Sequence, residues 1–394
     1  MALVEMIDEL LTILHEQPEY RAFHLDSQSV VLEDYLEIRP QKRAQIEGYI
    51  REGRILVGPW YILPDEYFVG GENLIRNLLL GHQVSKAHGG VSKIGYSPFS
   101  WGQISQLPQL YAGFGIDLIM FYRGVNSLES PGAEFVWEGA DGTKSLSSRF
   151  STMPRYNFYF GIYRPVVQGY TAGDVKYDKH TSGQLLHPAD LEQSHEDYHR
   201  IPTSSQYDPT KIKSAVETLT ENQDADFTSG QVIWMEGHDS SGPSPETSEL
   251  INELKMQFPE LDIKHATLEE YRDILRETLN MDELPVVKGE RRSAQYDHRS
   301  GNLYGYTTSA RMFLKQMNFD VERWLQAYAE PIDVFAGILG MDNDDQYLDF
   351  AWRKLIQNSA HDSIGGCSLD AVHEDGIQRY KESREIAQGV FRRG

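Results

Sequence analysis

The 394-residue sequence is short of cysteine, of positive charge and of long apolar runs. Its single cysteine, Cys367, excludes an internal disulfide and leaves the redox compartment undefined. Lysine and arginine number 37 against 59 aspartates and glutamates, and the net charge of -22 argues against nucleic acid or an anionic membrane as a partner. No apolar run reaches about 18 residues, so we predict no transmembrane helix. The acidic start MALVEMIDELL lacks the basic region of a signal peptide, and we expect a soluble, cytoplasmic protein.

The remaining composition is that of a globular protein with more than one core. Hydrophobic residues make up 40% of the chain and charged residues 24%, which is ordinary for a folded domain. The length favours one large domain followed by a smaller one. The 22 tyrosines and 6 tryptophans suit a protein that binds rings or sugars, although an aromatic core accounts for most of them.

Strands and helices are predicted to alternate along the first 125 residues. Apolar residues recur at helical spacing near the amino terminus, and Pro18 marks the end of that helix. Further elements are predicted in turn at 22–25, 40–51, 54–58, 72–86, 93–96, 103–113 and 117–122. This alternation predicts an α/β fold with a parallel sheet, closed or wound with right-handed crossovers. Because the chain begins with a helix, we expect the first strand of that sheet to be missing from this sequence.

The pattern changes in the middle of the chain. The run FVWEGADGTKSLSSRF, from Phe135 to Phe150, has two β-rich halves around Asp141-Gly142 and predicts a hairpin. Residues 151–209 show little periodicity and are expected to form an irregular insertion that shapes a site. Beyond it we predict strands at 231–235 and near Ile263, and helices at 245–257 and 268–279.

The last quarter of the sequence is predicted to be helical. Apolar residues at helical spacing follow Thr308 as one long stripe, and two more stripes cover 348–357 and 371–388. Three long helices in such a short stretch favour a three-helix bundle. We therefore expect a parallel-sheet domain followed by a helical domain.

Candidate site residues follow the predicted strands, at the ends where α/β folds place their chemistry. The carboxyl ends of successive strands carry Asp26, Asp65 with Glu66, Phe99 with Trp101, Arg123, and His238 with Asp239. Taken singly, such residues usually cap helices or solvate turns. Gathered on one rim, carboxylates accept hydrogen bonds from sugar hydroxyls, arginine donates them, and an indole stacks on the sugar ring. Paired carboxylates also meet the needs of glycosidic cleavage, so the rim predicts a carbohydrate substrate.

A second candidate site lies between two of the bundle helices. The run NSAHDSIGGCSLD, Asn358–Asp370, is predicted to be a tight, exposed turn. Such a turn allows His361 to ligate a metal ion while Asp362 meets substrate or orients the imidazole ring. The alternative is that both residues simply end and cap helices.

One short motif points to a different chemistry. His195, Glu196 and His199 match H-E-x-x-H, which on a helix places two imidazoles on one face for zinc and uses the glutamate as a base. The flanking residues are polar, Pro202 ends any helix within three residues, and no third ligand stands at a recognisable distance. A zinc metalloprotease is therefore a remote alternative.

Three stretches of the chain resemble the α-mannosidases of glycoside hydrolase family 38. They are GPWYILPDEYFVGGENLIRNLLLGH, the GQISQLPQLYAGFGID segment with FYRG, and SARMFLKQMN through LIQNSAHDSIGGCSLDAVH. The similarity covers nearly the whole sequence in the family's order. It implies a (β/α) barrel catalytic domain at about 1–290 and a three-helix middle domain at about 291–394. It also implies zinc as cofactor and an α-mannoside as substrate. The family's opening strand, which carries a zinc-binding His/Asp pair, and its large C-terminal β-domains have no counterpart in this sequence.

The resemblance also assigns roles to individual residues. It implies that His361 is a zinc ligand, that Asp362 contacts the sugar, that Arg123 lies near the nucleophile and that Asp239 is the acid/base. The family's loop reads Tyr-x-Pro-Asp-Ser-Phe-Gly, in which the aspartate is both nucleophile and zinc ligand, whereas this chain has Phe99 at that position. Phenylalanine neither attacks an anomeric carbon nor binds Zn²⁺. Only one of the family's four zinc ligands therefore has a counterpart here.

The sequence thus predicts a glycoside hydrolase of the α-mannosidase type. Asp239 is the catalytic candidate, and in an active glycosidase either Asp239 or a carboxylate such as Asp26 or Asp65 would take over the chemistry. The substrate-binding candidates are Arg123, Asp362, Asp26, Asp65 and Trp101, and His361 is the metal-binding candidate. A non-catalytic glycan-binding relative is the main alternative, because Phe99 replaces the nucleophile. The oligomeric state is open, and a homo-oligomer is one possibility.

Overall fold

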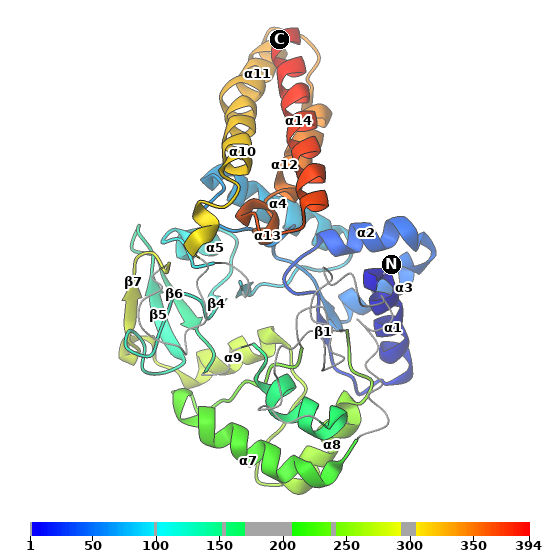
Figure 1. Cartoon of the computed structure of the whole chain (residues 1–394), viewed down its shortest axis with the longest axis vertical. Helices are drawn as coiled ribbons and strands as arrows, with labels where there is room; N and C mark the ends of the chain where they lie inside the picture. Colours follow the sequence, from blue (N-terminus) through cyan, green and yellow to red (C-terminus); the bar gives the residue numbers. More distant parts are fainter. Residues whose placement is uncertain (1, 98–100, 152–154, 170–206, 238–241, 293–304) are drawn as a thin grey trace.

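The computed structural model describes residues 2–97, 101–151, 155–169, 207–237, 242–292 and 305–394. It has a broad α/β part, from which a bundle of helices extends as a stalk toward the carboxyl terminus (Figure 1). Among the residues that the structure describes, no helix is both long and apolar enough to cross a membrane.

Among the described residues of the α/β part, short strands form two separate sheets. In the first sheet β1 (Phe23–His24) pairs in parallel with β2 (Ile55–Leu56). The second sheet has the order β3-β4-β6-β5-β7, and all of its neighbours are parallel except β5 and β6. Its strands are β3 (Gly95–Tyr96), β4 (Leu118–Met120), β5 (Glu134–Glu138), β6 (Lys144–Ser148) and β7 (Val286–Lys288). The parallel order confirms the α/β class that the alternating pattern predicts.

Helices surround these sheets. In the α/β part they are α1 (Ala2–Glu16), α2 (Val30–Ile38), α3 (Arg43–Arg51), α4 (Gly71–Ala87), α5 (Leu107–Gly113), α7 (Ile212–Gln223), α8 (Thr247–Gln257) and α9 (Leu268–Thr278). One ten-residue π-helix, η2 (Tyr159–Gln168), packs against α7. Helix α9 begins with a capping box, in which Thr267 and Glu270 each accept a hydrogen bond from the other's backbone N–H.

The stalk consists of three long helical segments and one short helix. Helix α10 (Met312–Trp324) continues through a π-helical turn, η8 (Leu325–Ala329), into α11 (Glu330–Ile338). Helices α12 (Asp345–Gln357) and α14 (Asp370–Arg393) pack against each other and against α10. The short α13 (His361–Gly365) connects them at the base of the stalk, facing the α/β part (Figure 1).

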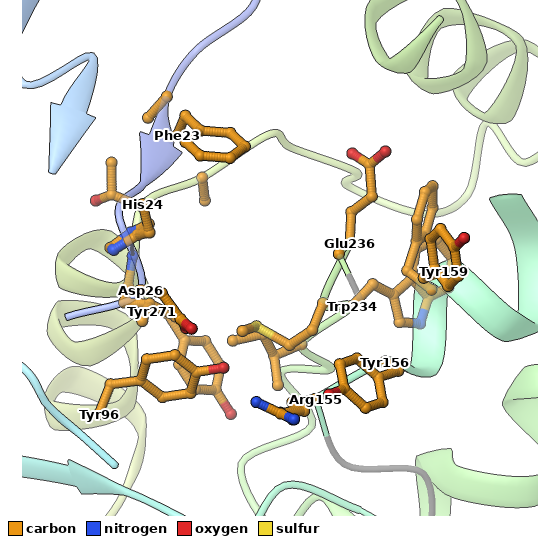
Figure 2. A pocket seen from close by; sticks show the side chains of 18 of the residues that line it. Phe23, His24, Asp26, Tyr96, Arg155, Tyr156, Tyr159, Trp234, Glu236 and Tyr271 are labelled. Atoms are coloured by element: carbon orange, nitrogen blue, oxygen red, sulfur yellow. Dashed lines mark hydrogen bonds between the residues drawn. The ribbon is translucent and has the colours of Figure 1, made fainter. Parts of the chain in front are cut away.

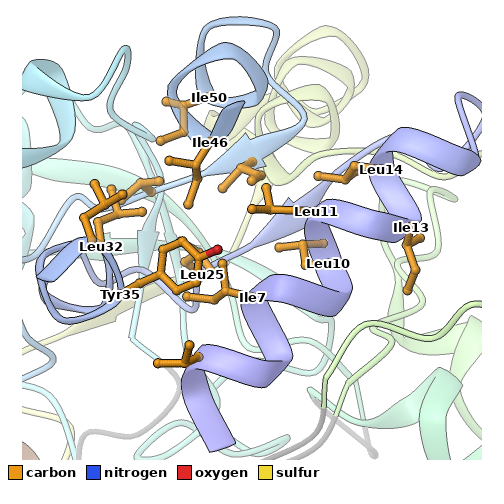
Figure 3. Packing of buried hydrophobic residues seen from close by; sticks show 14 of the residues in the cluster. Ile7, Leu10, Leu11, Ile13, Leu14, Leu25, Leu32, Tyr35, Ile46 and Ile50 are labelled. Carbon is orange, nitrogen blue, oxygen red and sulfur yellow. The ribbon is translucent and has the colours of Figure 1, made fainter. Parts of the chain in front are cut away.

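The apolar stripe of α1 explains why the amino terminus folds against the first sheet. Ile7, Leu10, Leu11 and Leu14 recur every three or four residues and are at most 1% exposed. They pack on side chains from α2, α3 and β1 (Figure 3). Burying each such side chain contributes about 2 kcal/mol, so this helix is fixed on one wall of the α/β part.

The stalk is joined to the α/β part at its base. Pro64 and Ala360 form an antiparallel bridge, and the Asp65 N–H donates to the Ser359 carbonyl at 3.3 Å. The backbone N–H of His361 donates to the Leu63 carbonyl at 3.1 Å. This pairing sets the start of α13 beside the loop that follows β2.

Several local predictions were wrong or incomplete. Residues 231–235 and the segment near Ile263 have no strand partner and are not strands, although both were predicted to be. Helices α2 and α7 were not predicted. The hairpin prediction is confirmed by β5 and β6, where Gly142 has a φ of 87° that suits the turn between them. The predicted insertion at 151–209 contains η2, and its residues 152–154 and 170–206 lie outside the described part.

Candidate functional site

A cavity of about 1570 Å³ opens in the α/β part and reaches the base of the stalk. Figure 2 shows Phe23, His24 and Asp26 on one side of it and Trp234 and Glu236 on the opposite side. The five candidates Asp26, Trp101, Arg123, His361 and Asp362 all line it. Residues that lie far apart in the sequence, on both domains, therefore share one hollow.

Arg123, Trp101 and His361 contact one another in sequence in this wall, Arg123 over the indole and His361 at its edge. The guanidinium carbon of Arg123, just beyond β4, lies 4.1 Å from the centre of the Trp101 ring. The rings of Trp101 and His361 are 6.0 Å apart and meet edge to face at 68°. The guanidinium also lies over the neighbouring Tyr122 ring at 5.1 Å. Cation–π contacts in a partly desolvated site orient the arginine.

His361 is positioned by its backbone and has a lowered pKa. It is the first residue of α13, and its Nε2 lies 3.8 Å from Oδ2 of Asp362. Burial lowers the pKa of His361, the Asp362 carboxylate opposes this shift, and the Arg123 cation adds to it. The imidazole is therefore neutral near neutral pH, which is the form that accepts a hydrogen bond or binds a metal ion.

Asp362 is about half exposed and contacts the one cysteine of the chain. The thiol of Cys367 lies 3.2 Å from Oδ1 of Asp362. Burial and this neighbouring carboxylate raise the pKa of Cys367 to about 12. A thiol with so high a pKa is not a nucleophile at neutral pH, so Cys367 supports the carboxylate by hydrogen bonding.

Asp26 is placed as predicted, at the end of β1, with its side chain in the cavity (Figure 2). Its φ of 46° and that of Ser27, 64°, show a left-handed backbone that non-glycine residues seldom adopt. Such strain is often found at functional sites.

Asp65 is not on the rim where it was predicted. It is fully buried, outside the lining of the cavity, and its Oδ1 lies 3.8 Å from Nη1 of Arg292. Its neighbour Glu66 is 2% exposed and accepts a hydrogen bond from the Ile104 N–H at 3.1 Å. The Pro64–Ala360 bridge covers this loop with the base of the stalk, a contact that no local sequence pattern encodes.

The burial of Asp65 predicts a pH effect on stability. Burial raises the pKa of Asp65 from 3.8 to about 6, against the opposing pull of Arg292. A raised carboxyl pKa means that the folded state binds more protons than the unfolded state between pH 4 and 6. The free energy of unfolding should therefore fall by about 3 kcal/mol as the pH rises through this window.

Asp65→Asn should remove this part of the pH dependence, because the amide does not titrate. Urea unfolding of the wild type and of Asp65→Asn at pH 4 to 8 measures the free energy of unfolding of each protein. The contributions of the other carboxyl groups cancel in the difference between the two values. Exposed Asp375, changed to asparagine, is the control. A difference between wild type and Asp65→Asn that stays constant with pH would contradict the prediction.

Two cavity residues were missed by the sequence reasoning. The pKa of Glu236 is raised by burial to about 7, and its carboxyl accepts a hydrogen bond from Oγ1 of Thr247 at 2.8 Å. Arg155 lies in the cavity with its guanidinium 4.4 Å from the Tyr156 ring centre. Glu236 directly follows a predicted strand, and this position at a strand end could have marked it as a candidate site residue. Arg155 lies in the stretch 151–209, which shows little periodicity, so no sequence pattern marked it as a candidate.

Three predictions fall on residues outside the described part. These are the acid/base candidate Asp239, Phe99 at the nucleophile position, and the H-E-x-x-H run at 195–199. Their roles stay predictions.

The described residues do not fit the zinc site that the resemblance implies. No three histidine, cysteine, aspartate or glutamate side chains in the described part are grouped closely enough to hold a metal ion. His361 and Asp362 are adjacent, but a protein zinc site takes at least three ligands.

An α/β part whose cavity is walled by an indole, a guanidinium and carboxylates has the features of a carbohydrate-active protein. Comparison with known proteins agrees. Residues 2–296 match the model of the glycosyl hydrolases family 38 N-terminal domain, and residues 303–393 match the α-mannosidase middle domain. The chain belongs to glycosyl hydrolase family 38.

Relatives and solved structures are similar along the whole chain. A putative mannosylglycerate hydrolase of Halalkalibacterium halodurans is 30% identical over 96% of this chain, and an α-mannosidase of Saccharomyces cerevisiae is 23% identical over 92%. The crystal structure of an α-mannosidase from Enterococcus faecalis V583 matches all of this chain with a TM-score of 0.82 and 27% identity. The chain spans 38% and 29% of the two relatives and 39% of that crystal structure.

Proposed function

We propose that this chain binds α-mannosides in the cavity and acts as a glycoside hydrolase on α-mannosidic bonds. The observation that carries the proposal is the convergence of Trp101 and Arg123 from one domain with His361 and Asp362 from the other on a single cavity. A site built from both domains is what the resemblance to α-mannosidases implies.

Each lining residue has a defined task in this proposal. Trp101 offers an indole face to the apolar face of a sugar ring. Arg123 donates hydrogen bonds to hydroxyl oxygens, and Asp362 and Asp26 accept them. Neutral His361 accepts or donates one further hydrogen bond beside them.

Proton transfer to the leaving group needs a carboxyl that is protonated near neutral pH. Asp239 is the candidate that the resemblance implies. Glu236 is a second candidate, because its raised pKa of about 7 keeps much of it protonated. Zinc binding, a cytoplasmic location and a homo-oligomeric state stay predictions.

The alternative function is glycan binding without hydrolysis, which Phe99 at the nucleophile position favours. Calorimetric titration with methyl α-mannoside and turnover of an aryl α-mannoside separate the two, with aryl β-mannoside and aryl α-glucoside as controls. Binding with turnover supports the hydrolase, and binding without turnover supports the alternative. Failure to bind any α-mannoside would overturn both.

Phe99→Asp alone is not expected to create zinc-dependent turnover. The substitution restores one carboxylate, while the histidine and aspartate of the opening strand have no counterpart, so at most two ligands would be present where three are needed. Turnover of the aryl α-mannoside with and without added zinc measures the effect, and Phe99→Asn is the matched control. Zinc-stimulated hydrolysis by Phe99→Asp that Phe99→Asn lacks would contradict the expectation.

A further inference from the structure

We propose that Lys315 of α10 is a positioning residue, whose ammonium group holds the short helix α13 against the cavity and so keeps His361 and Asp362 in place for the sugar. Helix α13 lies at the base of the stalk and begins with these two residues (Figure 1). The effect of Lys315 on sugar affinity rests on the proposed function. Its effect on the position of α13 does not, and it can be measured without a ligand.

The start of α13 is held by backbone contacts with the α/β part. The His361 N–H donates to the Leu63 carbonyl, and Pro64 forms a bridge with Ala360. Both partners belong to the loop that follows β2. Because backbone amides do not titrate in the physiological range, these contacts keep the same strength as the pH changes.

The carboxyl end of α13 is held by charged side chains instead. A helix leaves its last carbonyl groups without partners inside the helix, and lysine or arginine side chains often bind them. Nζ of Lys315 donates to the Gly365 carbonyl at 3.0 Å and to the Ala310 carbonyl at 2.5 Å. Nε of Arg311 donates to the next carbonyl, that of Gly366, at 3.2 Å. Both cations come from the start of α10, which therefore caps the end of α13.

Lys315 also contacts the loop that holds the start of α13. Its Nζ lies 4.8 Å from the centre of the Phe68 ring, and the guanidinium carbon of Arg292 lies 5.0 Å from the same centre. Nδ2 of Asn318, on the same helix as Lys315, donates to the Phe68 carbonyl at 3.5 Å. The loop after β2 and α10 thus form one support, which holds α13 at both of its ends.

The charge of Lys315 is lost at an unusually low pH. Burial lowers the pKa of this ammonium group from 10.5 to about 8, while Asp65 and Cys367 oppose the shift and Arg292 adds to it. The pKa of Asp65 is about 6 and that of Cys367 about 12. Arg292 and, on α10 itself, Arg311 stay protonated. Among these described groups, Lys315 is therefore the one that changes its charge between about pH 7.5 and 9.5.

Loss of this charge should loosen the end of α13. A neutral amine forms weaker hydrogen bonds than an ammonium group and makes no cation–π contact. The N–H groups of Gly366 and Cys367 both donate to the Asp362 carbonyl at 3.1 Å, so movement of this end displaces Asp362. A displacement of about 1 Å is enough to break a hydrogen bond to a ligand. We therefore expect the affinity for methyl α-mannoside to fall about tenfold between pH 7 and 9.5.

Calorimetric titration with methyl α-mannoside at pH 7, 8 and 9.5 tests this assignment. Lys315→Met should bind about tenfold more weakly than the wild type at pH 7 and show no further fall at pH 9.5. Lys315→Arg keeps a cation that does not titrate in this range, so its affinity should recover and stay constant with pH. In the control Lys354→Met, the wild-type affinity and its alkaline fall should both remain. Lys354, on α12, also lies over an aromatic ring, with Nζ 5.2 Å from the centre of the Phe350 ring.

Amide hydrogen exchange without a ligand separates this inference from the proposed function. At pH 7 the amides of residues 363–367 should exchange about tenfold faster in Lys315→Met than in the wild type, while those of residues 380–390 of α14 should not change. Unchanged exchange in 363–367, or an alkaline fall in affinity that persists in either Lys315 variant, would overturn the inference. If the wild type binds no α-mannoside, the proposed function fails, and the exchange rates alone decide whether Lys315 positions α13.

Discussion

Replacing Glu322 with alanine is expected to lower the free energy of unfolding by about 3 kcal/mol. Glu322 lies in α10 and is 6% exposed. Its Oε1 accepts three hydrogen bonds, from the Gly70 N–H at 3.0 Å and from the side-chain amides of Asn73 and Asn318 at 2.9 Å each. Alanine would leave the Gly70 N–H and the Asn73 amide without this acceptor, and Asn318 with only the Phe68 carbonyl at 3.5 Å. Each buried donor that loses its acceptor costs about 1–3 kcal/mol before the structure relaxes.

The effect should also reach the junction of the two domains. Asn73 lies in α4 of the α/β part, and its Oδ1 accepts a hydrogen bond from the Ser359 hydroxyl at 3.1 Å, next to α13. Loosening Asn73 therefore loosens the contact that places His361. We expect Glu322→Ala to weaken mannoside binding in addition to lowering stability.

Two variants show whether the lost hydrogen bonds, and not the glutamate-to-alanine change as such, lower the free energy of unfolding. Glu322→Gln keeps a carbonyl oxygen where all three donors converge, and it should cost less than about 1 kcal/mol. Glu374 on α14 is exposed, and its change to alanine should have an effect within about 0.5 kcal/mol. Urea unfolding followed by circular dichroism measures all three. A loss for Glu322→Ala no larger than that for Glu374→Ala would show that the network contributes nothing.

Replacing Arg123 with alanine is expected to weaken binding of methyl α-mannoside about 30-fold, which corresponds to one charge-assisted hydrogen bond. The guanidinium is held over the rings of Trp101 and Tyr122, so it is already oriented before the sugar arrives. Its loss also removes a cation that lowers the pKa of His361, and the imidazole should then protonate at a higher pH.

The conservative variant and a distant control sharpen this test. Arg123→Lys keeps the charge but loses the planar, multiple hydrogen-bonding geometry, so we expect only partial recovery of affinity. Arg393, at the carboxyl end of α14, also lies over an aromatic ring, with its guanidinium 4.9 Å from the Tyr347 ring centre. Titration calorimetry should find wild-type affinity in Arg393→Ala. Unchanged affinity in Arg123→Ala would remove Arg123 from the proposed site.

Local patterns in the sequence determined the kind of fold and the family. Ile7, Leu10, Leu11 and Leu14 predict α1 because helical periodicity is a property of neighbouring residues, and Asp141-Gly142 predicts the hairpin for the same reason. The order of strands and helices predicts that residues following successive strands meet at one rim, and the cavity contains Asp26 and Arg123.

The tertiary structure determined which of those residues are buried and which segments pair as strands. Asp65 follows a strand just as Asp26 does, yet it is buried because Ala360, almost 300 residues later, bridges Pro64. Residues 231–235 have a strand-like composition, but a strand exists only where a neighbouring strand pairs with it, and in the described part no strand does. Burial and strand pairing depend on contacts between segments that are far apart in the sequence. Only the folded structure therefore determines them.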